Sequence, residues 1–178
     1  MSRTSQRPVP APLDLTVLRG WLVGRLPEEW FTGPVEVVVD RDEITVVGPL
    51  ADPEVEADAD LHSARRGRAT AFREQTRAER IAIAQALEAE TQRAVSWGVT
   101  VGPERFLFTN QAVPVMTRLR QPERQVLDTL VASGVARSRA DAVAWCVRLV
   151  GQHAEEWLAD LTAALGAVED VRAAGPTV

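Results

Sequence analysis

The strongest constraint on the fold lies near the C-terminus, where one alternating segment is followed by two segments with helical periodicity. Residues 112–120 alternate between two sets of side chains, which is the pattern of a β-strand. Residues 121–134 and 138–150 repeat apolar side chains at helical spacing. One strand and two helices of about fifteen residues each bury too little apolar surface to fold alone, and a lone strand leaves its backbone unpaired. We therefore expect a homodimer in which the strand pairs with its copy.

The junction between the two predicted helices, "SGVARSRADAV", contains signals for the end of one helix and the start of the next. Gly134 supplies the left-handed residue that commonly ends a helix. Ser138 stands three residues before Asp141, which is the spacing of a capping box with Asp in place of Glu or Gln. Pro122 falls in the first turn of the first helix, where its missing N–H has no cost. The sequence therefore predicts two short helices joined by a tight hinge.

Residues 117–150 resemble the ribbon-helix-helix family of transcriptional regulators and antitoxins. The resemblance rests, in order and without gaps, on Arg118-Leu119, Leu127-Asp128-Thr129-Leu130, Gly134 and Ser138-Arg139-Ala140-Asp141-Ala142. It implies a homodimer that binds double-stranded DNA by placing a ribbon of paired strands in the major groove. It also implies that the N-terminus of the second helix holds a phosphate group.

Carried over position by position, the resemblance gives a set of candidate DNA-binding residues. Arg118 matches an outward position of the strand, from which an arginine can bind guanine O6 and N7. Met116 occupies another outward position, and the charge of Arg139 with the backbone at Ser138 could anchor a phosphate. The full predicted set is Met116, Arg118, Arg120, Arg137, Ser138 and Arg139.

In a second interpretation, the ribbon-helix-helix fold serves only for dimerisation, and the protein has a structural or protein-interaction role. Two observations favour it. Pro114 and Met116 lie on the outward face of the predicted strand, and the chain carries 20 basic against 25 acidic residues, a net charge of −5. Steep weakening of binding with salt would favour DNA over a protein partner.

The preceding part of the chain predicts an α+β domain of unknown role. A helix is expected within 15–31 with a break at Pro27, and hairpins are expected over 35–48 and 94–109. An acidic loop over 51–60 precedes an Arg-rich stretch that leads into a helix over about 70–95. The Arg-rich stretch has two interpretations: it forms a solvated helix face, or its arginines make auxiliary contacts to phosphates. The candidates for such contacts are Arg65, Arg66, Arg68 and Arg73.

The expected organisation is a flexible Pro-rich tail over 1–14, the α+β domain over 15–110, the ribbon-helix-helix module over 111–153 and an amphipathic helix over 154–173. The last helix places four apolar side chains on one face, and it either packs on its own domain or binds a partner. These four side chains are Trp157, Leu161, Leu165 and Val168.

Other classes of function lack support in the sequence. The single cysteine, Cys146, excludes a disulfide framework within the chain and fits a reducing cytosol, so we expect a cytoplasmic protein. No apolar run is long enough for a membrane span. His62 and His153 lack metal-ligand spacing, and no phosphate-binding glycine loop is present. We therefore expect no catalytic residues, metal or cofactor, and no enzymatic activity.

Overall fold

A computed structural model describes residues 13–56, 59–109 and 111–174. Within them the chain is a mixed α+β protein with one four-stranded sheet and six helices. It divides between Pro114 and Val115 into two compact units, called here the N-terminal unit and the C-terminal unit. Most of the predicted tail, residues 1–12, lies outside the described residues. Its last two residues belong to the fold, because Leu13 packs on the core and Asp14 caps the first helix.

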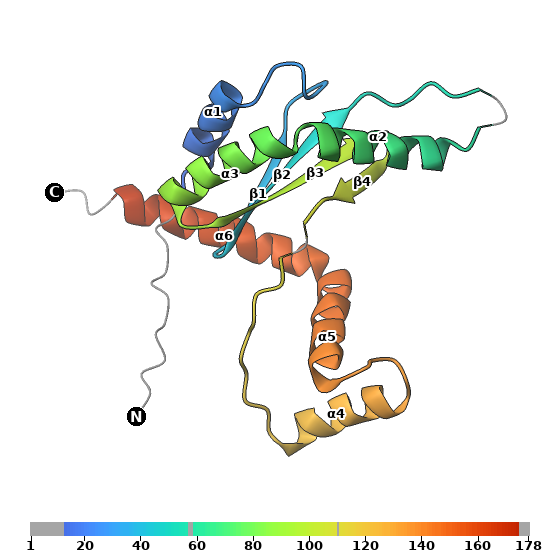
Figure 1. Ribbon diagram of the computed structural model, residues 1–178. Helices are drawn as coiled ribbons and strands as arrows, with labels where there is room; N and C mark the ends of the chain where they lie inside the picture. Colours follow the sequence, from blue (N-terminus) through green and yellow to red (C-terminus); the bar gives the residue numbers. More distant parts are fainter. Residues whose placement is uncertain (1–12, 57–58, 110, 175–178) are drawn as a thin grey trace. The chain divides into compact units, whose positions relative to one another are not determined.

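The sheet of the N-terminal unit has the strand order β1-β2-β3-β4 (Figure 1). Strands β1 (Glu36–Val39) and β2 (Glu43–Leu50) form one antiparallel hairpin, and β3 (Ala94–Val101) and β4 (Glu104–Leu107) form the other. Both predicted hairpins are therefore confirmed. The two central strands, β2 and β3, pair in parallel, with Val46 opposite Trp97. Parallel strands need a crossover connection, which the helical segment between them provides.

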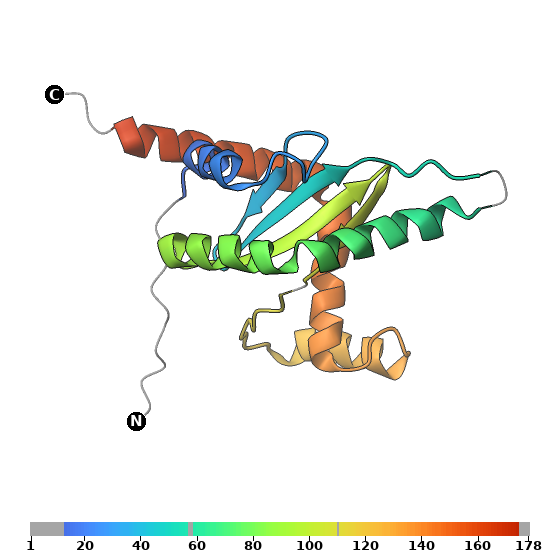
Figure 2. The same ribbon diagram turned by 45° about the horizontal axis from the view of Figure 1, so that its top comes forward.

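Three helices lie on one face of this sheet (Figures 1 and 2). They are α1 (Leu15–Arg25), α2 (Leu61–Gln75) and α3 (Arg77–Thr91). Alternate strand residues point toward the helices and build a continuous core. The buried core side chains include Leu18, Leu22, Val37, Ile44, Val46, Ile83, Leu87 and Trp97. The opposite face carries charged side chains, among them Glu36 and Arg105, whose Oε2 and Nη1 atoms lie 2.6 Å apart.

The helix predicted over about 70–95 is wrong in both its start and its continuity. It begins at Leu61, where the Asp60 carboxylate accepts the N–H of Ser63. It breaks at Thr76, so that the segment forms two helices, α2 and α3. The sequence signal for the start was weak because few apolar side chains occur between residues 61 and 71. The Arg-rich stretch therefore lies within α2 and the beginning of α3 rather than before a helix.

The C-terminal unit consists of three helices, α4 (Gln121–Ala132), α5 (Arg139–His153) and α6 (Glu155–Ala174). The predicted hinge between α4 and α5 is confirmed, since Gly134 adopts a left-handed φ of 77° and Ser138 caps α5. Among the described residues of this unit, three apolar side chains are buried: Leu127, Ala136 and Ala142. Leu119, Leu130, Val131, Val143 and Cys146 pack around them and stay partly exposed.

The strand predicted over 112–120 is not present in the single chain. Residues 111–120, called here the connecting segment, form neither helix nor strand. A strand is stabilised by hydrogen bonds to a neighbouring strand, and the described residues of one chain supply no such partner for this segment.

The helix predicted over 154–173 is confirmed as α6, although the apolar side chains predicted to share one of its faces stay largely exposed. Trp157 and Leu165 keep 61% and 63% of their surface exposed. In the part of the chain that the structure describes, α6 and the other helices are too short or too polar to cross a membrane.

Candidate nucleic-acid interface

The N-terminus of α5 is built by reciprocal hydrogen bonds around the hinge. Ser138 Oγ accepts the N–H of Asp141 at 3.2 Å. The Asp141 carboxylate in turn accepts the N–H of Arg137 at 3.0 Å, one residue earlier than in the usual capping box. This backbone hydrogen bond from Arg137 is the main reason that the pKa of Asp141 lies below its usual value. The hinge that sequence analysis assigned to phosphate binding is therefore a well-formed helix start, with one anionic side chain already at it.

Arg139, a predicted phosphate contact, is engaged by a carboxylate of its own unit. Its Nε and Nη2 donate to the two oxygens of Asp128 at 2.6 and 2.8 Å, a bidentate pair that ties α5 to α4. The hydrogen bonds from Arg139 hold the pKa of Asp128 below its usual range. A phosphate at this position would have to compete with Asp128 for the guanidinium.

The other predicted DNA-binding side chains are exposed. Met116 is 95% exposed, and Arg118 and Arg120 have no carboxylate oxygen within 4.0 Å among the described residues. The Arg137 side chain is 95% exposed and only distantly paired, with its Nε 3.6 Å from Asp141 Oδ2. Of the predicted set, Ser138, Arg137 and Arg139 come together at the hinge.

Several large apolar side chains of the C-terminal unit are exposed. On the connecting segment Val115 is 89% exposed, and on the helices Val126 and Val147 are 56% and 66% exposed. These side chains, with Met116, Leu149 and Val150, are called here the open apolar face. The part of the C-terminal unit that the structure describes leaves this face uncovered.

The four auxiliary candidates lie in α2 with different surroundings. Arg65 donates to both oxygens of Asp52 and to Glu104, which lowers the pKa of Asp52 and occupies the guanidinium. Arg68 donates to the carbonyl of Ala51 at 3.0 Å. Arg66 is exposed, and Arg73 lines a pocket. The acidic loop therefore neutralises part of the Arg-rich stretch, a pairing that only the folded chain reveals.

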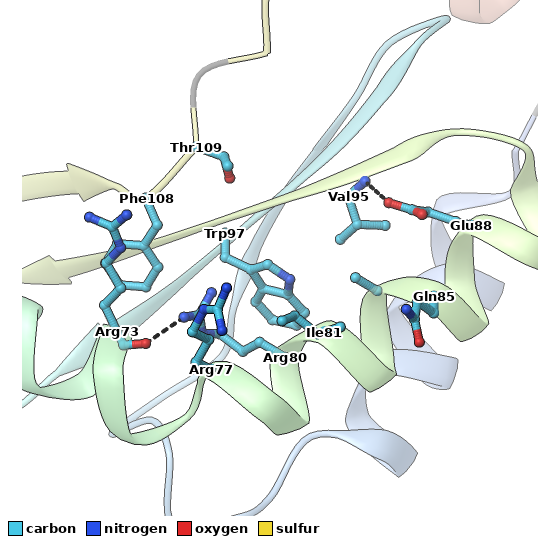
Figure 3. A pocket seen from close by; sticks show the side chains of 11 residues that line it. Arg73, Arg77, Arg80, Ile81, Gln85, Glu88, Val95, Trp97, Phe108 and Thr109 are labelled. Atoms are coloured by element: carbon cyan, nitrogen blue, oxygen red, sulfur yellow. Dashed lines mark hydrogen bonds between the residues drawn. The ribbon is translucent and has the colours of Figure 1, made fainter.

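The pocket beside Arg73, called here the arginine pocket, has a volume of about 460 Å³ and lies between α3 and the β3–β4 hairpin (Figure 3). Two of its arginines, Arg77 and Arg80, were not among the residues predicted from the sequence. The signal that could have revealed them is the Arg-rich stretch itself, which continues from Arg73 through Arg77 and Arg80. Trp97, from β3, could not have been assigned to the pocket without knowledge of the strand pairing. The pocket lining is Arg73, Arg77, Arg80, Ile81, Ala84, Gln85, Glu88, Val95, Trp97, Phe108 and Thr109.

Comparison with known proteins places both units in described families. The family model for the Rv1265-like protein, N-terminal domain, matches residues 16–107, and the model for the Mb1296 C-terminal domain matches residues 120–172. Similar relatives are the uncharacterized proteins Mb1296 of Mycobacterium bovis (strain ATCC BAA-935 / AF2122/97) and Rv1265 of Mycobacterium tuberculosis (strain ATCC 25618 / H37Rv). Each is 60% identical over 157 residues, which cover 88% of this chain and 69% of the relative. No solved structure matches the chain.

Proposed function

This chain belongs to the family of Rv1265-like proteins, and from that premise we propose that it is a homodimeric DNA-binding protein, a transcriptional regulator or antitoxin-like repressor. In this proposal the connecting segments of two protomers pair as an antiparallel ribbon, and the ribbon enters the major groove. Helices α4 and α5 of the two copies pack together beneath it, giving the ribbon-helix-helix arrangement. The proposal assigns the chain no catalytic role.

The open apolar face is the observation that carries the proposal. A unit that buries only Leu127, Ala136 and Ala142 among its described residues has a very small core of its own. A second copy would cover Val126 and Val147 and would give the connecting segment the strand partner that a single chain lacks. Leu119 already packs inward on the core cluster, which supports an alternation that points Arg118 and Arg120 outward.

The positive charges of the C-terminal unit support DNA as the ligand of this ribbon. Arg118 and Arg120 stand two residues apart on the outward side, and Arg137 stands exposed at the start of α5. In the dimer Arg118 would reach base edges, whereas Arg120 and Arg137 would contact phosphates. Two phosphate-contacting arginines per protomer predict that log K falls with log salt concentration with a slope of about −4.

Two observations favour the second candidate function, dimerisation for protein binding. The bidentate pair between Arg139 and Asp128 removes one of the predicted phosphate contacts, and Met116 presents an apolar side chain where a base reader would stand. A protein partner held by apolar contacts would bind with little dependence on salt.

The two candidates separate in one titration. Labelled duplexes of about 30 base pairs carry a randomised centre that is long enough for two half-sites one helical turn apart. Several rounds of selection against the full chain enrich any sequence that the protein prefers. Fluorescence anisotropy then measures the dissociation constant of the selected duplex at increasing salt. We expect a selected sequence and a slope near −4. A salt-independent association or the absence of any enrichment contradicts DNA binding.

Arg118→Ala tests the reading surface itself. Loss of a bidentate guanine contact weakens binding by about 1–3 kcal/mol per half-site, which is about 5- to 150-fold, and relaxes the preference at one base pair of each half-site. Arg148→Ala is the matched control, because this exposed arginine lies nine residues beyond Arg139 on α5, about 14 Å along the helix. Equal effects of the two substitutions would show that Arg118 contributes only net charge.

A further inference from the structure

We propose that the arginine pocket of the N-terminal unit binds a small organic phosphate, a phosphate monoester that carries an apolar group. This site is separate from the C-terminal unit, and the proposal does not depend on DNA binding. Its starting point is the presence of three guanidinium groups around one cavity, with the carboxylate of Glu88 as the counter-charge in its lining.

Arg80 is the central residue of the site because it is buried yet has no anionic partner. Only 7% of its surface is exposed, and no carboxylate oxygen lies within 4.0 Å of it among the described residues. Burial of the guanidinium, with the nearby charges of Arg73 and Arg77, lowers the pKa of Arg80 from its usual value. A buried arginine remains charged, and an unpaired buried charge is costly unless a counter-ion neutralises it.

The contacts of Arg80 hold the guanidinium in place and leave donors available. Nε donates to Thr76 Oγ1 at 2.9 Å, and Nη2 donates to the carbonyl of Arg73 at 2.7 Å. The plane of the group lies over the Phe108 ring, 4.9 Å from its centroid. These contacts use two of five N–H groups. Nη1 has no hydrogen-bond acceptor in the part of the chain that the structure describes, so two oxygens of a phosphate group can bind the free N–H groups of Nη1 and Nη2.

The charge balance of the lining selects a doubly charged ligand. Figure 3 shows Arg73, Arg77 and Arg80 gathered at one end of the pocket and Glu88 near the other end, where its Oε1 accepts the N–H of Val95 at 3.1 Å. Three guanidinium groups and one carboxylate leave an excess of two positive charges. A phosphate monoester at neutral pH carries a charge between −1.5 and −2, which matches this excess.

The other lining residues select an apolar body on the phosphate. Ile81, Ala84 and Val95 form an aliphatic wall between the arginines and Glu88, and 42% of the Ile81 surface is exposed. Trp97 is 4% exposed, and its Nε1 is buried with no acceptor within the described residues, which leaves a donor unsatisfied in the pocket wall.

Isothermal titration of the full chain with phenyl phosphate, inorganic phosphate and phenol tests the assignment. We expect phenyl phosphate to bind at millimolar concentration or below, inorganic phosphate to bind more weakly and phenol not to bind. In a ¹H–¹⁵N spectrum the indole N–H of Trp97, identified by its loss in Trp97→Phe, should shift during the titration. No binding of phenyl phosphate, or binding that leaves the Trp97 signal unmoved, overturns the proposal.

Variants separate a built site from general electrostatic attraction. Arg73 and Arg77 are exposed, so their replacement by alanine leaves the fold intact, and each should weaken phenyl phosphate binding by about tenfold or more. Arg80→Lys keeps the charge but loses the fork, and should weaken binding as well. Arg19→Ala on α1 is the matched control and should bind as the wild type does.

Two results contradict the assignment even where binding is seen. An equal loss in Arg19→Ala would attribute the binding to net charge alone. Displacement of phenyl phosphate by a short DNA duplex, with the same dependence on Arg77, would make the pocket part of a DNA-binding surface instead.

Discussion

Replacing Val147 by alanine tests how much the open apolar face would contribute to the proposed dimer. Val→Ala removes two carbon atoms, worth about 1.6 kcal/mol when fully buried. Because 66% of the Val147 surface is exposed in the single chain, about 1 kcal/mol per protomer depends on a second copy. The twofold axis doubles this contribution to about 2 kcal/mol per dimer. The dissociation constant of the dimer should therefore rise about 30-fold.

Sedimentation equilibrium at several protein concentrations gives this dissociation constant directly. Val23→Ala is the matched control, since Val23 lies on α1 of the N-terminal unit, is 76% exposed and undergoes the same chemical change. Both substitutions replace a β-branched residue in a helix, so their intrinsic effects on helix stability are equal. Circular dichroism should report the same helix content for both variants.

Either of two results would contradict this role of the open apolar face. A wild-type chain that stays monomeric at the highest soluble concentration would leave the open apolar face without the proposed partner. A measurable dimer whose dissociation constant is the same in Val147→Ala and Val23→Ala would place the interface away from α5.

Two further predictions concern the stability of the C-terminal unit. Ser138→Ala removes the side-chain acceptor for the Asp141 N–H and should destabilise α5 by about 1 kcal/mol. Amide hydrogen exchange should become faster in α5 and stay unchanged in the N-terminal unit. Equal exchange in the variant and the wild type would contradict the capping role of Ser138. Hydrogen bonds from Arg139 lower the pKa of Asp128 in the folded chain. The stabilising contribution of this carboxylate is therefore present above its unfolded pKa of about 3.9 and is lost as the pH falls through its folded pKa. Exchange in α4 and α5 should therefore be faster in Asp128→Asn than in the wild type at neutral pH, and the difference should vanish in acid; a difference that persists below both pKa values would exclude the Arg139 pair as its cause.

Local chemistry made much of the fold predictable from the sequence. Pro27 follows the end of α1 at Arg25, and Gly134 and Ser138 mark the hinge that the structure contains. Each of these signals depends on the conformational limits of one residue, such as the locked φ of proline or the left-handed φ of glycine, and needs no information about distant contacts.

The missed features depend on contacts between residues far apart in the chain. The parallel pairing of β2 with β3 aligns Val46 with Trp97, and only this register brings Trp97 to the arginines of α2 and α3. The pairing of Arg65 with Asp52 likewise requires the acidic loop to return along α2. The strand expected in the connecting segment is different in kind, because a strand is stabilised by a neighbouring strand and the described residues of the chain offer this segment none.

The edge strands of the sheet limit the addition of strands from other chains. Strands β1 and β4, which form the two edges, are only four residues long, and each carries a charged side chain of the Glu36–Arg105 pair. Short, charged edge strands are poor templates for a foreign strand, so fibre-like addition of further chains along the sheet is disfavoured. The sheet of the N-terminal unit is therefore protected against strand addition along both of its short edge strands.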